Sequence, residues 1–488
     1  MEPGTSVQVS RATVEDAVMG RGPNFPPAPP PVTAAITGQR PVGGQRPVGG
    51  LGAASAQSLA RRKRAFQVHM QQLARDLHLT GERLSAWHLL PEDLLVGIFR
   101  MLSLRDRGRC ASVCRSWQAV CALPILWRHF VFEFMQRTAM MSSSTSPALT
   151  KQVFAKHRDH LRHVVLKVDS HQQSVQMACS VMQQLGGCSL QSLQLVTVAG
   201  PSFAMAEPKK VLAALMTIVS KASLKLLAVE ETSADDALLE TLADKSQSTL
   251  TCLRVNGCLS VSASGMARTV QSCQHLCDLS MDYGQLSDAF LQALATPPHA
   301  PLKNLTVSVA GPDEQLEAAQ PAAPNWPALA PTSWALLAGS APTAAVAMHF
   351  RYMRESDYEG FFRCPLPVTS LRFEWLVPVA VLGRVARHCP RLRHLLISSS
   401  GEEAVDGALT EIAEECRELR ALELGACAVN CSTVVQVAKL CGPRLTSLVV
   451  SEELVLEDGD CNLQSTSQEV SCLLQRPWDV VFMPTWLE

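Results

Sequence analysis

Apolar residues in this chain of 488 residues return with a period of 26, and this period constrains the fold more than any other feature. The recurring pattern is Leu-x-x-Leu-x-apolar. Its first leucine stands at Leu224, Leu250, Leu276 and Leu302, and again at Leu392, Leu419 and Leu445. Apolar residues that alternate along the chain predict a short β-strand with one buried face. Each copy of the pattern therefore predicts one strand.

Helical patterns lie between these strands, most clearly over 288–296, 406–416 and 432–441. A strand and a helix in every unit of about 20–29 residues are typical of leucine-rich repeats. Such a unit cannot bury its own core, so the units stack into a curved solenoid with the strands on the concave face. We therefore predict an α/β solenoid over residues 150–475. Looser copies of the pattern start at Leu161, Leu190 and Val368.

Three cysteines stand three residues before the first leucine of a repeat: Cys273, Cys389 and Cys416. A small, apolar thiol fits the tight turn between a helix and the next strand. We predict that these cysteines have a structural role rather than a redox or catalytic one.

The array is interrupted between Val309 and Pro342, where alanine and proline are frequent. If the next strand lies at 343–348, the step from Leu302 is longer than one period, and the excess is a short insertion. Aromatic residues follow at Phe350, Tyr352, Tyr358, Phe361 and Phe362. This cluster has two interpretations. It forms a local core that packs the insertion, which we favour, or it forms a binding ridge.

A second feature precedes the repeats. Pro91, Glu92 and Asp93 are typical of a first helical turn, because proline needs no amide partner there and acidic groups favour the positive helix end. Leucine and isoleucine then recur at helical spacing, and a shorter apolar cluster follows on a second helix. A module of about 45 residues cannot bury both apolar stripes, so part of this surface is expected to face a partner.

This module, assigned to residues 84–135, resembles the F-box in its Leu-Pro-Glu, Val-Cys-Arg-x-x-Trp and Leu-Trp elements. Arg107 departs from the pattern, because many F-boxes have leucine there. The resemblance implies docking to the Skp adaptor, which bridges to a cullin and its RING subunit. The predicted adaptor-binding residues are Leu90, Pro91, Leu94, Leu95, Ile98, Leu102, Val113, Cys114, Trp117, Leu126 and Trp127.

Composition excludes several other classes of protein. The formal net charge of −1 gives no electrostatic reason to expect nucleic acid or membrane as a partner. No apolar segment is long enough to span a bilayer, and the segment Met1–Gly20 lacks the core of a signal peptide. The seventeen cysteines include no C-x-x-C pair, so a self-contained RING ligase, a metal site and a disulfide framework are not expected.

We also expect no enzyme activity and no cofactor. The chain lacks His-Glu-x-x-His, Gly-x-Ser-x-Gly and a phosphate-binding glycine loop, and its 13 histidines show no ligand spacing.

The leader, residues 1–56, is rich in proline, glycine and alanine, and this composition predicts disorder. A basic helical linker is predicted over 57–83. Its run Arg61-Arg62-Lys63-Arg64 is interpreted as a nuclear import signal or as a solvated basic turn, with no preference between the two. The expected localisation is the nucleus and the cytoplasm.

From Trp87 to Trp486 the chain resembles F-box/leucine-rich-repeat protein three and its close paralogues, the cryptochrome-binding F-box proteins. The matching segments occur in order along the chain, and include 126–128, 132–134, 167–170, 201–203, 381–385, 389–392 and 483–486. The resemblance implies a substrate receptor of an SCF ubiquitin ligase, with cryptochrome as its client in the circadian clock. The chain would supply proximity and no chemistry of its own. The alternative is a scaffold that binds a partner without targeting it for degradation.

The predicted client-binding tail is residues 476–488. In the resembled family the tail enters the flavin pocket of cryptochrome and ends in tryptophan, which implies that Met483, Pro484, Thr485 and Trp486 contact the client. Here Leu487 and Glu488 follow that tryptophan. The alternative is that Trp486 packs back on the last repeat as a cap. The five acidic residues between Glu452 and Asp460 are interpreted as a solvated turn or, less favoured, as a surface for a basic partner.

Overall fold

The structure of the chain is a computed structural model. It describes residues 90–135, 144–169, 171–198, 207–311, 326–459 and 461–481, without the side chain of Glu453. The predicted leader (1–56), the basic linker (57–83) and the tail residues Met483–Trp486 lie outside the described residues. The chain divides into two compact units. The helical unit contains 90–129 and 146–160, and the solenoid unit contains 130–135, 144–145 and 161–481.

The helical unit consists of α3 (Glu92–Arg100), α4 (Leu104–Ala111), α5 (Arg115–Cys121), η2 (Pro124–Trp127), α6 (Pro147–His157) and η3 (Arg158–His160). Polar side chains fix the helix starts. The Ser103 hydroxyl accepts a hydrogen bond from the Asp106 amide at 3.1 Å, and the Ser146 hydroxyl accepts one from the Leu149 amide at 3.1 Å. Such caps satisfy amides that have no partner within the helix.

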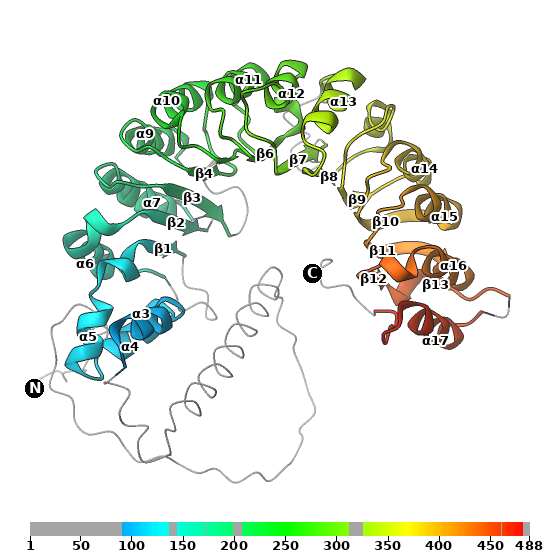
Figure 1. Cartoon of the computed structure of the whole chain (residues 1–488), viewed down its shortest axis with the longest axis horizontal. Coiled ribbons are helices and arrows are strands. Elements are labelled where there is room, and N and C mark those ends of the chain that lie inside the picture. The colour runs from blue at the N-terminus through cyan, green and yellow to red at the C-terminus, as the bar shows by residue number, and fades with distance from the viewer. Residues whose placement is uncertain are drawn as a thin grey trace, which may run out of the picture. The chain divides into compact units, whose positions relative to one another are not determined.

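The solenoid unit contains one sheet whose strands follow chain order from β1 to β12, with β13 paired to β11. Figure 1 shows the helices along one side of these strands. The strands are β1 (His129–Phe134), β2 (His163–Val168), β3 (Ser192–Thr197), β4 (Leu226–Val229), β5 (Cys252–Arg254), β6 (Asp278–Asp282), β7 (Asn304–Ala310), β8 (Ala345–Arg351), β9 (Ser370–Leu376), β10 (His394–Ala404), β11 (Ala421–Asn430), β12 (Ser447–Val450) and β13 (Val455–Leu456).

The helices of this unit are α7 (Gln172–Leu185), α9 (Pro208–Val219), α10 (Asp236–Ser246), α11 (Ala263–Ser272), α12 (Asp288–Ala295), α13 (Pro331–Ser340), α14 (Val379–His388), α15 (Asp406–Glu415), α16 (Cys431–Cys441) and α17 (Leu463–Leu474). Short 3-10 turns are η4 (Tyr283–Gln285), η5 (Glu355–Gly360), η6 (Gly442–Arg444) and η7 (Glu452–Leu454). The predicted α/β solenoid is confirmed, and the helices expected over 288–296, 406–416 and 432–441 agree with α12, α15 and α16 to within one residue.

The 26-residue period is the register of the sheet. Leu253 pairs with Leu279, and Leu279 pairs with Leu305, in successive parallel strands. All three side chains are fully buried. Because the period places equivalent leucines opposite one another, their side chains form a continuous apolar row between strands and helices.

The insertion is located where the sequence predicts it. Asn304 of β7 pairs with Ala345 of β8, a step longer than one period, and α13 lies within that step. Phe350 stacks on Phe373 with centroids 5.1 Å apart, and it also contacts Phe361 and Phe362. These rings are at most 4% exposed, so the favoured interpretation of the cluster as a local core is confirmed for all its members except Tyr352, which is 51% exposed.

The three repeat cysteines are fully buried at helix ends. The Cys416 thiol donates to the Cys389 carbonyl at 3.4 Å, across one repeat. Burial raises the pKa of Cys273 to about 11 and that of Cys416 to about 12. Thiols held in the protonated form are poor nucleophiles, which agrees with the predicted structural role.

Candidate protein-docking surfaces

The eleven residues predicted to contact an adaptor differ widely in exposure. Leu95, Leu126 and Trp127 are at most 3% exposed, so they form the core of the helical unit instead of offering surface. Leu94 is 44% and Val113 is 63% exposed, and Pro91 is exposed as well. Partly exposed are Leu90, Ile98, Leu102, Cys114 and Trp117. Sequence reasoning missed Met101, which is 58% exposed beside the end of α3.

The helix stripe explains this division. Leu95 and Phe99 are four residues apart and point into the unit, where Phe99 meets the edge of Trp117 with centroids 5.3 Å apart. Leu94 precedes Leu95 by one position, which turns its side chain about a quarter of the helix circumference away. Among the described residues of the helical unit, the exposed large apolar side chains are therefore Leu94, Met101 and Val113, while Leu95 and Phe99 belong to its core.

Trp127 anchors that core through two contacts. Its indole nitrogen donates to the Cys121 carbonyl at 2.9 Å, and its ring stacks on His157 of α6. Burial, together with the neighbouring His160 and Lys156, lowers the pKa of His157 to about 4. His157 is therefore neutral at pH 7. Neither the contact nor α6 follows from the F-box pattern.

Arg107, the departure from the F-box pattern, has a structural role. One guanidinium nitrogen (Nη1) donates to the Leu126 carbonyl at 2.7 Å, and Nε donates to the Leu102 carbonyl at 3.2 Å. Burial lowers the pKa of this guanidinium. The side chain thus connects Leu102, which follows the C-cap of α3, to Leu126 in η2, and a leucine at position 107 would make neither hydrogen bond.

The predicted tail divides at Val481. The Trp478 indole donates to the Leu448 carbonyl at 2.9 Å, and the Val481 amide donates to the Val450 carbonyl at 2.9 Å. In return the Glu452 amide donates to the Val481 carbonyl at 3.0 Å. Residues 476–481 therefore belong to the last repeat, and the boundary predicted at 476 is too early. Met483, Pro484, Thr485 and Trp486 lie outside the described residues, so their role stays a prediction.

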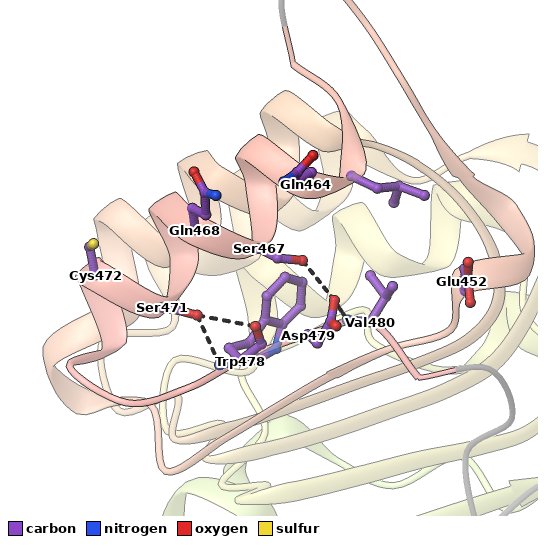
Figure 2. A pocket seen from close by; sticks show the side chains of 10 residues that line it. Glu452, Gln464, Ser467, Gln468, Ser471, Cys472, Trp478, Asp479 and Val480 are labelled. Carbon is purple, nitrogen blue, oxygen red and sulfur yellow. Dashed lines mark hydrogen bonds between the residues drawn. The ribbon is translucent and has the colours of Figure 1, made fainter.

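An open groove of about 820 Å³ lies between α17 and this final segment (Figure 2). Its lining comprises Glu452, Leu463, Gln464, Ser467, Gln468, Ser471, Cys472, Trp478, Asp479 and Val480. Sequence reasoning missed the groove, because Trp478 and α17 are separated by a turn that no repeat pattern describes.

The F-box-like family matches residues 87–133. F-box/LRR-repeat protein 21 of sheep (Ovis aries) is 36% identical over 410 residues, which cover 84% of this chain and 92% of the relative. This chain belongs to the F-box/LRR-repeat protein family. The mouse (Mus musculus) relative of the same name shares 37% over 402 residues, covering 82% and 91%. Human (Homo sapiens) F-box/LRR-repeat protein 8 shares 26% over 367 residues, covering 73% and 93%.

Among solved structures, the yeast Rad7 and Elc1 complex contains a chain similar to this F-box/LRR-repeat protein, with a TM-score of 0.40 and 13% identity. The similarity covers 86% of this chain and 97% of that one.

The F-box match ends at residue 133, within β1. The last residues of the F-box segment are therefore part of the solenoid sheet.

Two residues of the acidic loop accept hydrogen bonds from neighbouring helices of the solenoid. Asp458 accepts a hydrogen bond from the Ser432 amide at 2.9 Å, and this bonding holds the pKa of its carboxyl below the usual range. Glu457 accepts one from the Leu463 amide at 3.1 Å, near the start of α17. Two of the five acidic residues therefore cap helices, while Glu452 and Glu457 are exposed, in agreement with the favoured interpretation of a solvated turn.

A second exposed apolar surface lies at the ends of β8 and β9. Tyr352 and Trp375 are 51% and 54% exposed, with ring centroids 5.8 Å apart. Tyr352 has a φ of 49°, and its carbonyl lies so close to Gly311 that a Cβ there would clash with it. Beside the rings, Arg351 pairs with Glu374 at 2.8 Å. Of the predicted aromatic cluster, Tyr352 alone remains available as a binding ridge, and sequence reasoning missed its neighbour Trp375.

Within the described residues, no group of His, Cys, Asp and Glu is arranged to bind a metal ion. None of the described helices is long and apolar enough to cross a bilayer.

Proposed function

We propose that this F-box/LRR-repeat protein is the substrate-recognition subunit of an SCF ubiquitin ligase. The observation that supports this most is the combination, in one chain, of an F-box with exposed Leu94, Met101 and Val113 and a separate repeat solenoid. The F-box binds the Skp adaptor and, through it, the cullin and RING subunits. The solenoid holds a client. The chain supplies proximity and orientation, and ubiquitin transfer is done by the enzymes of the complex.

The client we propose is cryptochrome, held by the solenoid and by the C-terminal tail. This proposal depends on the resemblance to the cryptochrome-binding F-box proteins. Val481 is bonded to Val450 and Glu452 of the last repeat, and residues 482–488 follow it in the sequence. Trp486 is a suitable anchor, because tryptophan buries a large area while only two side-chain torsions are fixed.

Leu487 and Glu488 follow Trp486, and a client pocket must accommodate both. We propose proteasomal degradation of the client as the consequence of ubiquitination, and action in the nucleus and the cytoplasm. The run Arg61–Arg64 is the proposed import signal.

Affinity purification with mass spectrometry, with and without the last five residues, tests the client assignment. Cryptochrome should be recovered with the whole chain and depleted without residues 484–488. Trp486→Ala should weaken cryptochrome binding, and free flavin should compete with the tail. Unchanged binding in both assays contradicts the tail assignment.

The half-life of the bound client distinguishes a ligase receptor from a scaffold. A receptor shortens the client's half-life when this chain is expressed, and the effect disappears when the F-box surface is disrupted. An unchanged or longer half-life with normal binding favours the scaffold.

A further inference from the structure

Arginine is concentrated on the turns that lead into β10, β11, β12 and the final segment 476–481. The turns 388–393, 415–420, 441–446 and 475–477 contain six arginines and two acidic residues, Glu415 and Glu418. The equivalent turns before β3 to β6 (186–191, 220–225, 247–251 and 273–277) contain two lysines and no arginine. Since the formal net charge of the whole chain is −1, this positive charge is local. The six residues are called the arginine row: Arg391, Arg393, Arg417, Arg420, Arg444 and Arg476.

Hydrogen bonds hold the row in register along the amino-terminal edge of the sheet. The Arg420 amide donates to the Arg393 carbonyl at 2.8 Å, and the Thr446 amide donates to the Arg420 carbonyl at 2.7 Å. The Arg476 side chain then donates through Nη1 to the Thr446 carbonyl at 2.7 Å. Adjacent strands lie about 4.8 Å apart, so three such steps extend the row over about 14 Å. An extended peptide covers that distance with about four or five residues.

The row already binds one carboxylate of this chain. Arg393 donates through Nε to Glu418 at 2.8 Å, and its Nη2 lies 2.7 Å from the same oxygen. The Arg444 guanidinium donates to two main-chain carbonyls, which leave its charge unneutralised. Arg417 and Arg420 are exposed, and within the described ranges neither guanidinium has an ion pair or a hydrogen bond. Most of the positive charge of the row therefore remains available to a partner.

The chemistry of the row fits carboxylates. A planar guanidinium binds a carboxylate through two of its N–H groups, as Arg393 binds Glu418. The four turns contain no phenylalanine, tyrosine or tryptophan on which the bases of a nucleic acid could stack. We propose that the arginine row binds an extended acidic segment of a partner protein. This contact goes beyond the proposed receptor function and does not depend on the identity of the client.

Fluorescence anisotropy of a labelled peptide of alternating glutamate and glycine tests the proposal with the purified whole chain. The test variant is Arg417→Gln with Arg420→Gln, which removes the two guanidinium groups that have no partner among the described residues. The matched control is Lys221→Gln with Lys225→Gln, which removes the same charge from exposed side chains on the equivalent turn before β4. The basic run Arg61–Arg64 is present in every variant, so it contributes equally to all of them.

We expect the arginine double variant to weaken binding of the peptide about fivefold, because each exposed ion pair contributes little and the two losses add. The lysine control should bind like the unaltered chain. Glu418→Gln should tighten binding about twofold, because it releases Arg393 for the peptide. Circular dichroism and the urea midpoint must first agree among these variants.

Equal affinity of the arginine double variant and the unaltered chain overturns the proposal, and so does an equal loss in the lysine control. Unchanged or weaker binding by Glu418→Gln overturns it as well. An RNA oligonucleotide of the same formal charge is the competing ligand. If the RNA binds more tightly than the peptide and loses affinity in the arginine double variant, the assignment to an acidic protein segment is wrong.

Discussion

Trp127 and His157 lie face to face, with ring centroids 4.0 Å apart and ring planes 6° from parallel. The contact joins the last turn of the F-box segment to α6, which the repeat pattern does not include. His157 is only 6% exposed, so this stack stabilises the helical unit as long as the imidazole is neutral.

This stack makes the stability of the helical unit depend on pH. The pKa of His157 is lowered from 6.5 to about 4 by burial, so the unfolded chain binds a proton at a higher pH than the folded one. The stabilisation is complete above pH 6.5 and is lost as pH falls toward 4. Between pH 7 and pH 5 we expect a loss of about 1–2 kcal/mol. Hydrogen exchange of the α6 amides, corrected for intrinsic rates, measures it.

His157→Phe keeps a buried aromatic ring that does not titrate. In this variant the protection of α6 should be the same at pH 7 and pH 5, apart from effects common to the whole chain. An equal pH dependence in both proteins would show that another group is responsible.

Neighbouring leucines of α3 should have opposite roles. Leu95→Ala leaves a cavity in the core and should reduce the free energy of unfolding of the helical unit by about 2–5 kcal/mol. Leu94→Ala, at a site 44% exposed, should change it by less than about 1 kcal/mol. At a temperature where both variants are folded, Leu94→Ala should reduce the affinity for the adaptor more than Leu95→Ala does. Urea unfolding and titration with purified Skp adaptor measure the two effects. Equal stability losses would refute the division into core and surface.

Arg107→Ala should destabilise the helical unit by about 1–3 kcal/mol, because it leaves the Leu102 and Leu126 carbonyls without their charged donor. Arg107→Lys retains the charge but cannot reproduce both bonds, so it should recover only part of the loss. The urea midpoint of the transition reports the difference. A stability of Arg107→Ala equal to that of the unaltered chain would mean that the cost of burying the guanidinium cancels its two bonds.

The cysteines should differ sharply in reactivity. The pKa of Cys416 is raised to about 12 and burial excludes reagent, whereas Cys472 is exposed on α17. Iodoacetamide at mildly alkaline pH should alkylate Cys472 quickly and leave Cys273, Cys389 and Cys416 unmodified until the chain is unfolded in urea. Peptide mass spectrometry reads both states. Alkylation of Cys416 in the folded chain would contradict its structural role.

The repeat region could be predicted in detail because its information is local and periodic. The leucine spacing fixes strand identity, register and buried face together, so even β8, displaced by the insertion, could be located from the alternating apolar residues that follow it. The helical unit was less predictable. A stripe of leucines shows which face is apolar, but whether Leu94 or Leu95 is buried depends on α5 and η2, which pack against α3.

The ends of the solenoid were also predicted incompletely. Trp478 and the acidic residue Asp458 act through hydrogen bonds to Leu448 and Ser432, about one repeat away. Such bonds leave no periodic trace in the sequence, which therefore predicts that 476–481 belong to the tail and that the acidic loop is a solvated turn or a partner surface. Only the three-dimensional structure shows that 476–481 bond to the last repeat and that Asp458 caps α16.

Adaptor binding by the exposed face of α3 is the central claim, and co-purification of the tagged chain tests it most directly. The double variant Leu94→Asp with Ile98→Asp should lose both the Skp adaptor and the cullin. Leu336→Asp, an equivalent change at a leucine of α13 that is 47% exposed, should retain both. Recovery of the adaptor and the cullin with the double variant, at the level of the unaltered chain, would contradict the account.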